Sequence, residues 1–175
     1  NFSHFTPPKQ HVNLVNPVFG WSGVQHKALF LNAYWDELPR IRLITSPNIK
    51  GLPLKFEYEY SEWNYHTFQE ELKKCDVGFL PRKTDDPYNS GHSSFKALVF
   101  ASLGIPVVAS KIPSYVKLSS YYDGIVFLED HENSIQQCID ELKNRNLNNG
   151  RLRAYYSCEN QATLMADFLS NNLDG

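Results

Sequence analysis

The chain has 175 residues and a mass of 20.2 kDa, which is the size of one domain with a single packed core. Hydrophobic residues make up 42% of the sequence and charged residues 21%, values that exclude a disordered chain, a collagen helix and a coiled coil. The net charge of -2 provides no overall positive field. We therefore expect neither a nucleic acid nor an anionic membrane to be held by bulk electrostatics, so any anion must be bound locally.

Cysteine content and apolar runs indicate the cellular setting. The three cysteines, Cys75, Cys138 and Cys158, are odd in number and lack the spacing of metal ligands, so we expect neither a disulfide framework nor a metal site. The sequence has no apolar run of about 18 residues and no signal-peptide pattern, and a reducing cytoplasm fits it best. Because the chain begins at Asn1 and its only methionine is Met165, we expect it to be a piece of a longer protein.

Short apolar runs alternate with segments of helical period, which is typical of βαβ units and a parallel sheet. We expect residues 1–11 to be a linker or crossover and residues 12–175 to form one domain. The predicted fold class is α/β, a Rossmann-like three-layer domain around a mostly parallel six-stranded sheet. The predicted strands are residues 12–19, 41–45, 54–60, 77–80, 107–109 and 125–128.

Helices are predicted between these strands and at the end of the chain. The period of two in residues 54–60 places that strand near an edge of the sheet. Helix 95–103 is apolar nearly all round apart from Lys96, so it should be central, and Gly104 suits the left-handed position after it. The predicted helices are residues 24–35, 64–74, 95–103, a short helix from Pro113, a helix capped by Asp130, and residues 151–169.

Three of these helices show an inward face in the sequence. The first should turn Leu29, Phe30, Ala33 and Tyr34 toward the core. The helix after Asp130 should bury Ile135, Cys138, Ile139 and Leu142. The last should bury Leu152, Tyr155, Ala162 and Met165.

The loop after the first strand is the first candidate anion site. Ligands of open parallel sheets bind beyond the carboxyl ends of the strands. Here Gly20, Ser22 and Gly23 come between a strand and a helix, where free backbone N–H groups and the helix dipole favour a phosphate. The alternative is that the glycines only form a tight turn.

The segment before helix 95–103 is the second and stronger candidate. His92, Ser93 and Ser94 precede the helix, and Lys96 lies in its first turn, where a cation is unfavourable beside the positive end of the dipole. The hydroxyls, free N–H groups and ammonium would together hold a diphosphate. The alternative is a helix cap with a lysine paired to Asp85 or Asp86.

Residues 94–110 (SFKALVFASLGIPVVAS) resemble the donor-binding helix and following strand of GT-B glycosyltransferases of the group 1 type. Residues 76–81 (DVGFLP) resemble the strand ahead of that motif, and residues 20–23 (GWSG) resemble the loop that meets the donor diphosphate. The resemblance covers about residues 12–143. One position departs from the pattern, because Val99 stands where many relatives carry a glutamate assigned to the ribose.

The resemblance implies that the chain is the nucleotide-sugar-binding half of a hexosyltransferase whose N-terminal, acceptor-binding half is missing, so that the fragment alone is inactive. The donor would be a UDP-sugar or GDP-sugar, bound without a metal or other cofactor and without a nucleic acid partner. The enzyme would be cytoplasmic, with peripheral membrane association of the full-length protein, and would serve polysaccharide biosynthesis. Catalytic residues, sugar and base stay open, and His92 is a candidate to replace the missing ribose contact.

Two other functions and one further site are open at this point. A nucleotide-sugar epimerase would share the architecture but needs carboxylates in the sugar pocket, and a flavodoxin-like regulatory module needs acidic residues at its strand ends. The aromatic segment 58–68, with Pro81 and Arg82, could wall a base pocket. Core packing is the favoured interpretation of that segment in a chain that is 14% aromatic.

Overall fold

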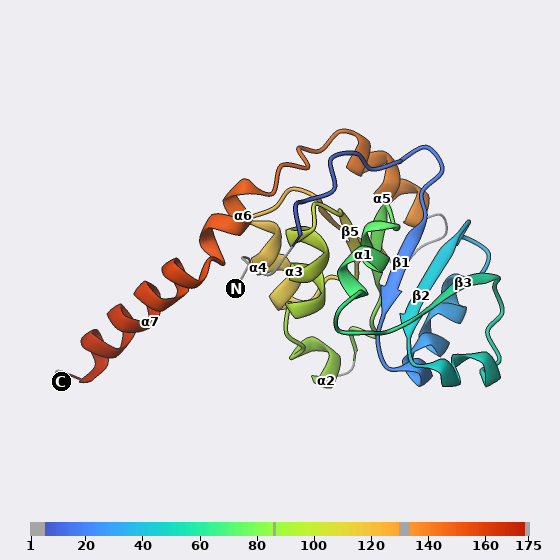
Figure 1. The fold of residues 1–175 in the computed structure, drawn as a ribbon, viewed down its shortest axis with the longest axis horizontal. Helices are drawn as coiled ribbons and strands as arrows, with labels where there is room; N and C mark the ends of the chain where they lie inside the picture. The colour runs from blue at the N-terminus through green and yellow to red at the C-terminus, as the bar shows by residue number, and fades with distance from the viewer. Residues whose placement is uncertain (1–5, 86, 130–133, 174–175) are drawn as a thin grey trace.

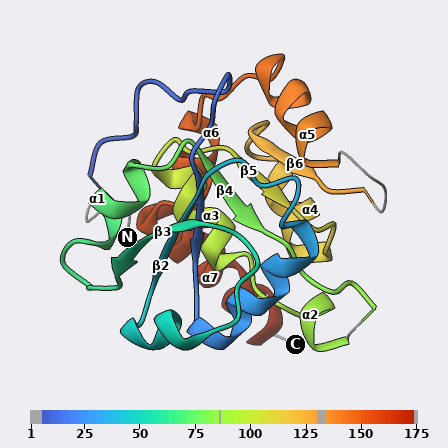
Figure 2. The same cartoon turned by 90° about the vertical axis from the view of Figure 1, so that its right-hand side faces the viewer.

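A computed structural model describes residues 6–85, 87–129 and 134–173 of the chain. In this part the strands form one six-stranded sheet in the order β3-β2-β1-β4-β5-β6, and every neighbouring pair is parallel (Figures 1 and 2). The α/β three-layer prediction is confirmed, with a sheet that is parallel throughout. The strands are β1 (Phe19–Ser22), β2 (Ile41–Thr45), β3 (Tyr58–Glu62), β4 (Val77–Leu80), β5 (Val107–Ala109) and β6 (Ile125–Phe127).

Helices pack against both faces of the sheet. Apolar residues from α1, α3, α4 and α6 form the core on one face, and those from η2, η3 and α5 form it on the other. The elements are the 3₁₀ helices η2 (Gln25–Tyr34) and η3 (Pro47–Gly51) and the α-helices α1 (Phe68–Lys73), α2 (Pro87–Ser90), α3 (Phe95–Ser102), α4 (Pro113–Ser119), α5 (Ser134–Lys143), α6 (Gly150–Tyr155) and α7 (Cys158–Leu173).

Helix α3 lies unusually close to the middle of the sheet. Gly20 of β1 and Gly78 of β4 are paired in register and face this helix. A Cβ atom would lie 3.2 Å from the Phe100 ring at Gly20 and 2.7 Å from it at Gly78. The two glycines therefore leave a slot that the Phe100 side chain fills, and Phe100 is only 1% exposed.

Several elements lie where the sequence predicts them. β2, β4 and β5 have the predicted bounds, and α3 and β6 agree within one residue. β3 is an edge strand, as its alternating pattern predicts, and Gly104 has the left-handed φ of 75°. The four residues expected to face inward from α5 are all buried. The predicted cap Asp130 lies outside the described residues.

The prediction of the first strand is wrong. The sequence predicts a strand at residues 12–19, but β1 begins at Phe19. The Asn13 side chain accepts hydrogen bonds from the backbone N–H groups two and three residues later, which turns the chain. Pro17 has no N–H to donate to a sheet. As a result Gly20 lies inside the strand rather than in the loop after it.

The first helix has a different period from the one predicted. Residues 25–34 form a 3₁₀ helix, in which side chains three apart share a face. Ala28 and Leu31 are buried, and Tyr34 follows three residues later with its ring 5.3 Å from that of Phe79. Phe30, predicted to face inward, is 45% exposed.

The last predicted helix is two helices. α6 ends at Tyr155 and α7 begins at Cys158, and the side-chain amides of Asn160 and Gln161 donate to the Tyr155 carbonyl between them. Leu152 is buried under α3, but Met165 is 60% exposed. Helix α7 projects away from the sheet, so its apolar residues do not form the inward face that the sequence predicts (Figure 1).

Two other elements begin later than predicted. β3 begins at Tyr58 because the chain turns before it, with the Leu54 N–H donating to the Leu52 carbonyl. α1 begins at Phe68, whereas the sequence predicts a helix cap at Asn64. The Asn64 side chain does accept from the backbone N–H two residues later, as a cap would, but residues 65–67 form turns and the α-helix begins only after Thr67.

The segment before β1 is held to the domain through Asp76. Its carboxylate accepts hydrogen bonds from the Lys9 ammonium at 2.7 Å and from the backbone N–H groups of Asn13 at 3.0 Å and Val18 at 3.1 Å. Burial alone would raise the pKa of Asp76, but these donors hold it below its ordinary value of 3.8. The ionised carboxylate is thus the group that fixes this segment.

We predict that Asp76→Asn lowers the free energy of unfolding by about 2 kcal/mol, because charge-assisted hydrogen bonds to a buried group are lost. Since the folded-state pKa is lowered, this contribution is present above pH 3.8 and disappears as the pH falls through the lower folded-state value. Urea unfolding at pH 7 and at pH 3 measures both effects. The exposed Asp140→Asn is the matched control, and an equal effect of the two substitutions would contradict the prediction.

Candidate functional site

The candidate site lies at the carboxyl edge of the sheet, where the strand order reverses. The chain runs from β1 to β2 and β3 on one side and from β4 to β5 and β6 on the other, so the switch point lies between β1 and β4. Open parallel sheets bind their ligands at this point. Lys96, in the first turn of α3, reaches this edge and lines two cavities there.

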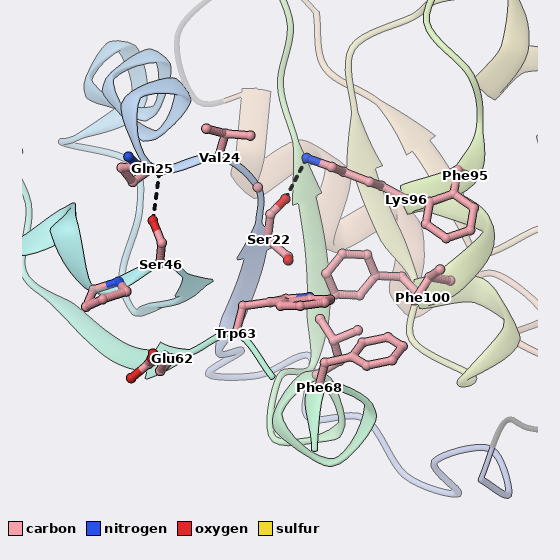
Figure 3. A pocket seen from close by; sticks show the side chains of 14 residues that line it. Ser22, Val24, Gln25, Ser46, Glu62, Trp63, Phe68, Phe95, Lys96 and Phe100 are labelled. Carbon is pink, nitrogen blue, oxygen red and sulfur yellow. Dashed lines mark hydrogen bonds between the residues drawn. The ribbon is translucent and has the colours of Figure 1, made fainter. Parts of the chain in front are cut away.

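The larger cavity, here called the aromatic cavity, has a volume of about 500 Å³. It is bounded by the loop after β1, the ends of β2 and β3, and helices α1 and α3 (Figure 3). Its polar side chains include Ser22, Gln25 and Lys96. Its apolar wall is made by Val24, Trp63, Phe68, Phe95, Val99 and Phe100.

The smaller cavity, here called the basic cavity, has a volume of about 40 Å³ and lies on the other side of Lys96. Basic side chains from three parts of the chain line it, namely Lys27 of η2, Arg82 and His92 near α2, and Lys96 of α3. The described residues that line it include no Asp or Glu. It is thus a small space with both polar and apolar walls and an excess of positive charge.

The Lys96 ammonium is held at the end of β1. Its Nζ donates to the Ser22 carbonyl oxygen at 2.7 Å (Figure 3). The same atom lies 5.6 Å from the centre of the Trp21 ring. A Cβ atom at Gly23 would lie 2.8 Å from Nζ and from the Trp21 ring, so a side chain there would displace the ammonium or the indole. The Thr45 hydroxyl donates to the Gly23 carbonyl at 2.6 Å, which ties this loop to the end of β2.

The surroundings of Lys96 disfavour its charge. Burial, together with the positive charges of Arg82 and Lys27, lowers the pKa of Lys96 to about 8. Burial and the charges of Arg82, Lys27 and Lys96 likewise lower the pKa of His92. In the part of the chain that the structure describes, no carboxylate pairs with Lys96. A bound anion would supply the missing negative charge.

Arg82 is held in place by neighbours on two elements. Its Nε donates to the Tyr115 hydroxyl at 3.3 Å, and its Nη1 donates to the Asn89 side-chain oxygen at 3.4 Å. The Ser110 side-chain oxygen accepts from the Arg82 backbone N–H and its hydroxyl donates to the Arg82 carbonyl, so the backbone is fixed as well. The guanidinium is therefore pre-positioned beside the basic cavity.

Sequence reasoning did not include Arg82 and Lys27 among the anion ligands. Arg82 follows β4 directly, and the carboxyl end of a strand at the switch point was a usable signal. Lys27 follows the loop after β1 within one turn, and the sequence favours a solvated surface residue at that position, whereas the structure places Lys27 in the lining of the basic cavity. There its ammonium lies over the Tyr88 ring at 5.1 Å from the centre.

The structure brings Ser22, Gly23 and His92 to the two cavities around Lys96 and leaves other predicted site residues apart. Ser22 and Gly23 lie beside Lys96, whereas Gly20 packs against Phe100 inside β1. His92 lines the basic cavity, and its ring lies edge-on to Tyr88 at 5.6 Å.

Ser93 and Ser94 precede α3 as predicted, but neither is among the residues that line the two cavities. Ser93 is exposed, and Ser94 occupies the helix cap position without a side-chain capping hydrogen bond. The proposed pairing of Lys96 with Asp85 is absent, since Lys96 bonds to Ser22 instead, and Asp86 lies outside the described residues.

The residues that could wall a base pocket, namely the aromatic segment 58–68 with Pro81 and Arg82, are divided between the two cavities. Trp63 and Phe68 line the aromatic cavity, while Pro81 and Arg82 line the basic one, so the four do not wall a single pocket. Tyr65 is 70% exposed.

Within residues 6–85, 87–129 and 134–173, no cluster of three or more His, Cys, Asp or Glu side chains could hold a metal ion. Over the same residues, no helix combines the length and apolar character that crossing a bilayer requires. A comparison of the chain with protein-family models and with curated protein sequences found no match.

We predict that Lys96 titrates near pH 8 and that its charge destabilises the free protein. Because the folded-state pKa lies below the ordinary 10.5, the native chain releases its proton first, and the free energy of unfolding rises between pH 8 and 10.5. This rise should be absent in Lys96→Met, which should also melt at a higher temperature than the parent at pH 7.

The measurement is thermal and urea unfolding of both proteins from pH 7 to 10. Lys117→Met on the exposed face of α4 is the control and should keep the rise. A parent and a Lys96→Met protein with parallel pH profiles would show that the ammonium is solvated in the native state.

Proposed function

We propose that this chain binds a nucleoside-diphospho-sugar and forms the donor-binding part of a glycosyltransferase. The observation that carries the proposal is the partly buried Lys96 ammonium at the switch point of the sheet, beside Arg82 and Lys27 and without a carboxylate partner among the described residues. Such a cluster is unfavourable alone and favourable with a polyanion. Diphosphate is the anion that joins a sugar to a nucleoside.

The two cavities around Lys96 suit the two ends of such a donor. The aromatic cavity, at about 500 Å³, is large enough for a nucleoside. The basic cavity, at about 40 Å³, has room for a few waters or part of a phosphate in the free chain. Lys96 lines both cavities, so a diphosphate bridging them would contact its ammonium.

The residues around the basic cavity would stabilise the charge of a departing diphosphate and would not serve as a general acid or base. Lys96 and Arg82 would donate charge-assisted hydrogen bonds to phosphate oxygens and so stabilise negative charge as the sugar leaves. Gly23 permits the close approach of the loop, and the backbone at Ser22 lies against the same ammonium. His92, held neutral by its surroundings, could hydrogen-bond to the sugar or phosphate.

The resemblance of residues 94–110 to group 1 GT-B glycosyltransferases supports the same function. Val99, which replaces the glutamate of that pattern, lines the aromatic cavity and is 7% exposed. The ribose would therefore meet an apolar wall in this chain, and its hydroxyls need another partner. Transfer of the sugar requires a separate acceptor-binding domain. We further propose that the full-length enzyme associates peripherally with a membrane.

The other candidate functions have less support. An epimerase needs carboxylates at the sugar, and the described residues lining the basic cavity include none. A phosphoacceptor module needs acidic residues at the end of β1, where the chain has Trp21 and Ser22.

We predict that UDP or GDP raises the melting temperature of the chain and that Lys96→Ala abolishes the rise. Removing the ammonium takes away a charge-assisted hydrogen bond to phosphate, which weakens binding by about tenfold to a hundredfold. Differential scanning fluorimetry at millimolar ligand measures the effect. Lys117→Ala is the control and should respond like the parent. The proposal is wrong if no nucleoside diphosphate produces a shift.

We also predict that nucleoside diphosphate affinity falls above pH 8, where Lys96 loses its proton. The dissociation constant should rise about tenfold per pH unit between pH 8.5 and 9.5, because only the protonated amine attracts phosphate. Calorimetry across this range measures it. Lys96→Arg stays charged, so whatever affinity it has should be flat over the same range, and a flat parent profile would contradict the role of Lys96.

A further inference from the structure

Two large rings that line the aromatic cavity, Trp63 and Phe95, are substantially exposed, and Trp63 is the one that follows a strand of the sheet. Trp63 follows the last residue of β3 and is 50% exposed, although its backbone N–H continues the ladder by donating to the Thr45 carbonyl at 2.9 Å. Its backbone is thus fixed while half of its surface is uncovered. An exposed tryptophan at the rim of a cavity is a ready stacking surface.

Phe68 packs against one face of the Trp63 ring and so fixes its orientation. The two rings stack with centroids 6.4 Å apart and an interplanar angle of 26°. Figure 3 shows the indole nearly edge-on, with Phe68 on one side of its plane and Ser22, Val24 and Lys96 on the other. One face of Trp63 is therefore supported, and the opposite face looks toward the loop after β1.

The opposite wall has little capacity to read the edge of a base. Gln25 and Ser46, its neighbouring polar side chains, hydrogen-bond to each other, with the Ser46 hydroxyl donating to Gln25 Oε1 at 2.7 Å. Val24 and Val99 add apolar side chains to the lining. The carboxylate among the described lining residues is that of Glu62, which is exposed and directly precedes Trp63, so the two side chains point to opposite faces of the extended chain. The area of contact between the base and the Trp63 ring is then the main property by which this cavity could distinguish one nucleoside diphosphate from another.

We propose that Trp63 makes this site prefer purine over pyrimidine nucleoside diphosphates by stacking on the base. The inference rests on the proposed function, since it places the base on Trp63 and the diphosphate at Lys96. A two-ring base covers more of the indole face than a one-ring base does, and the cavity of about 500 Å³ has room for it. Ring size, rather than the hydrogen-bonding pattern of one base, determines the preference.

The test is a calorimetric panel of GDP, ADP, UDP and CDP on the 175-residue chain and three variants. The two purine compounds should bind about tenfold more tightly than the two pyrimidine compounds, a difference typical of stacking on a tryptophan. Trp63→Ala should weaken the purine compounds about tenfold and the pyrimidine compounds far less, and Trp63→Phe should retain part of the preference. Trp35→Ala is the matched control, because Trp35 is 52% exposed and lies outside the cavity.

Fluorescence gives an independent readout. GDP should quench the tryptophan emission of the parent and of Trp35→Phe, and the quenching should be largely lost in Trp63→Phe. A circular dichroism spectrum identical to that of the parent checks that each variant is folded.

The outcomes separate the two proposals. If no nucleoside diphosphate binds, the proposed function is wrong. If UDP or CDP binds as tightly as the better purine compound, or if Trp63→Ala weakens all four equally, the stacking preference is wrong while the donor site stands. If only one of GDP and ADP binds tightly, hydrogen bonds to the edge of that base determine the specificity, and the proposal about ring size is overturned.

Discussion

The site depends on how closely helix α3 approaches the centre of the sheet. The Phe100 ring fills the slot left by Gly20 and Gly78, where a Cβ atom on β4 would lie 2.7 Å from the ring. Lys96 precedes Phe100 by four residues and so lies one turn away on the same side of the helix. The packing that seats Phe100 therefore also brings the Lys96 ammonium to the end of β1. A larger residue on either strand would hold the helix, and with it the ammonium, away from the sheet.

The same packing creates the electrostatic imbalance at the switch point. Because α3 is apolar nearly all round, its one charged side chain is drawn out of water beside the Trp21 ring. Arg82 and Lys27 arrive from different elements and add positive charge, and this lowers the pKa of Lys96 to about 8. A fold that keeps an ammonium in such surroundings is less stable than one without it. We interpret this loss of stability as the consequence of a polyanion site, since a diphosphate would restore the balance.

The candidate site is predicted from the sequence at some residues and not at others. A lysine in the first turn of an apolar helix is visible in the sequence, and the structure places Lys96 at the predicted edge. Ser93 and Ser94 are its neighbours in sequence, yet neither lines the cavities, because adjacency does not determine direction. Arg82 reaches the basic cavity only because Tyr115, Asn89 and Ser110 hold it there. The donor and the transfer reaction remain predictions that rest on the motif and on this geometry.

The amino-acid sequence by itself determined the α/β class, the bounds of β2, β4 and β5, the central place of α3 and the position of Lys96 in its first turn, because apolar periodicity and helix-end chemistry are local properties. The tertiary structure alone decided that the sheet is parallel throughout, that Gly20 lies inside β1 against Phe100, and that Trp63 presents an open face to the cavity. These features depend on contacts between residues far apart in the chain, such as Phe100 with Gly78 and Trp63 with Thr45. No local pattern encodes such contacts, since they form only when the strands pair and the helices pack.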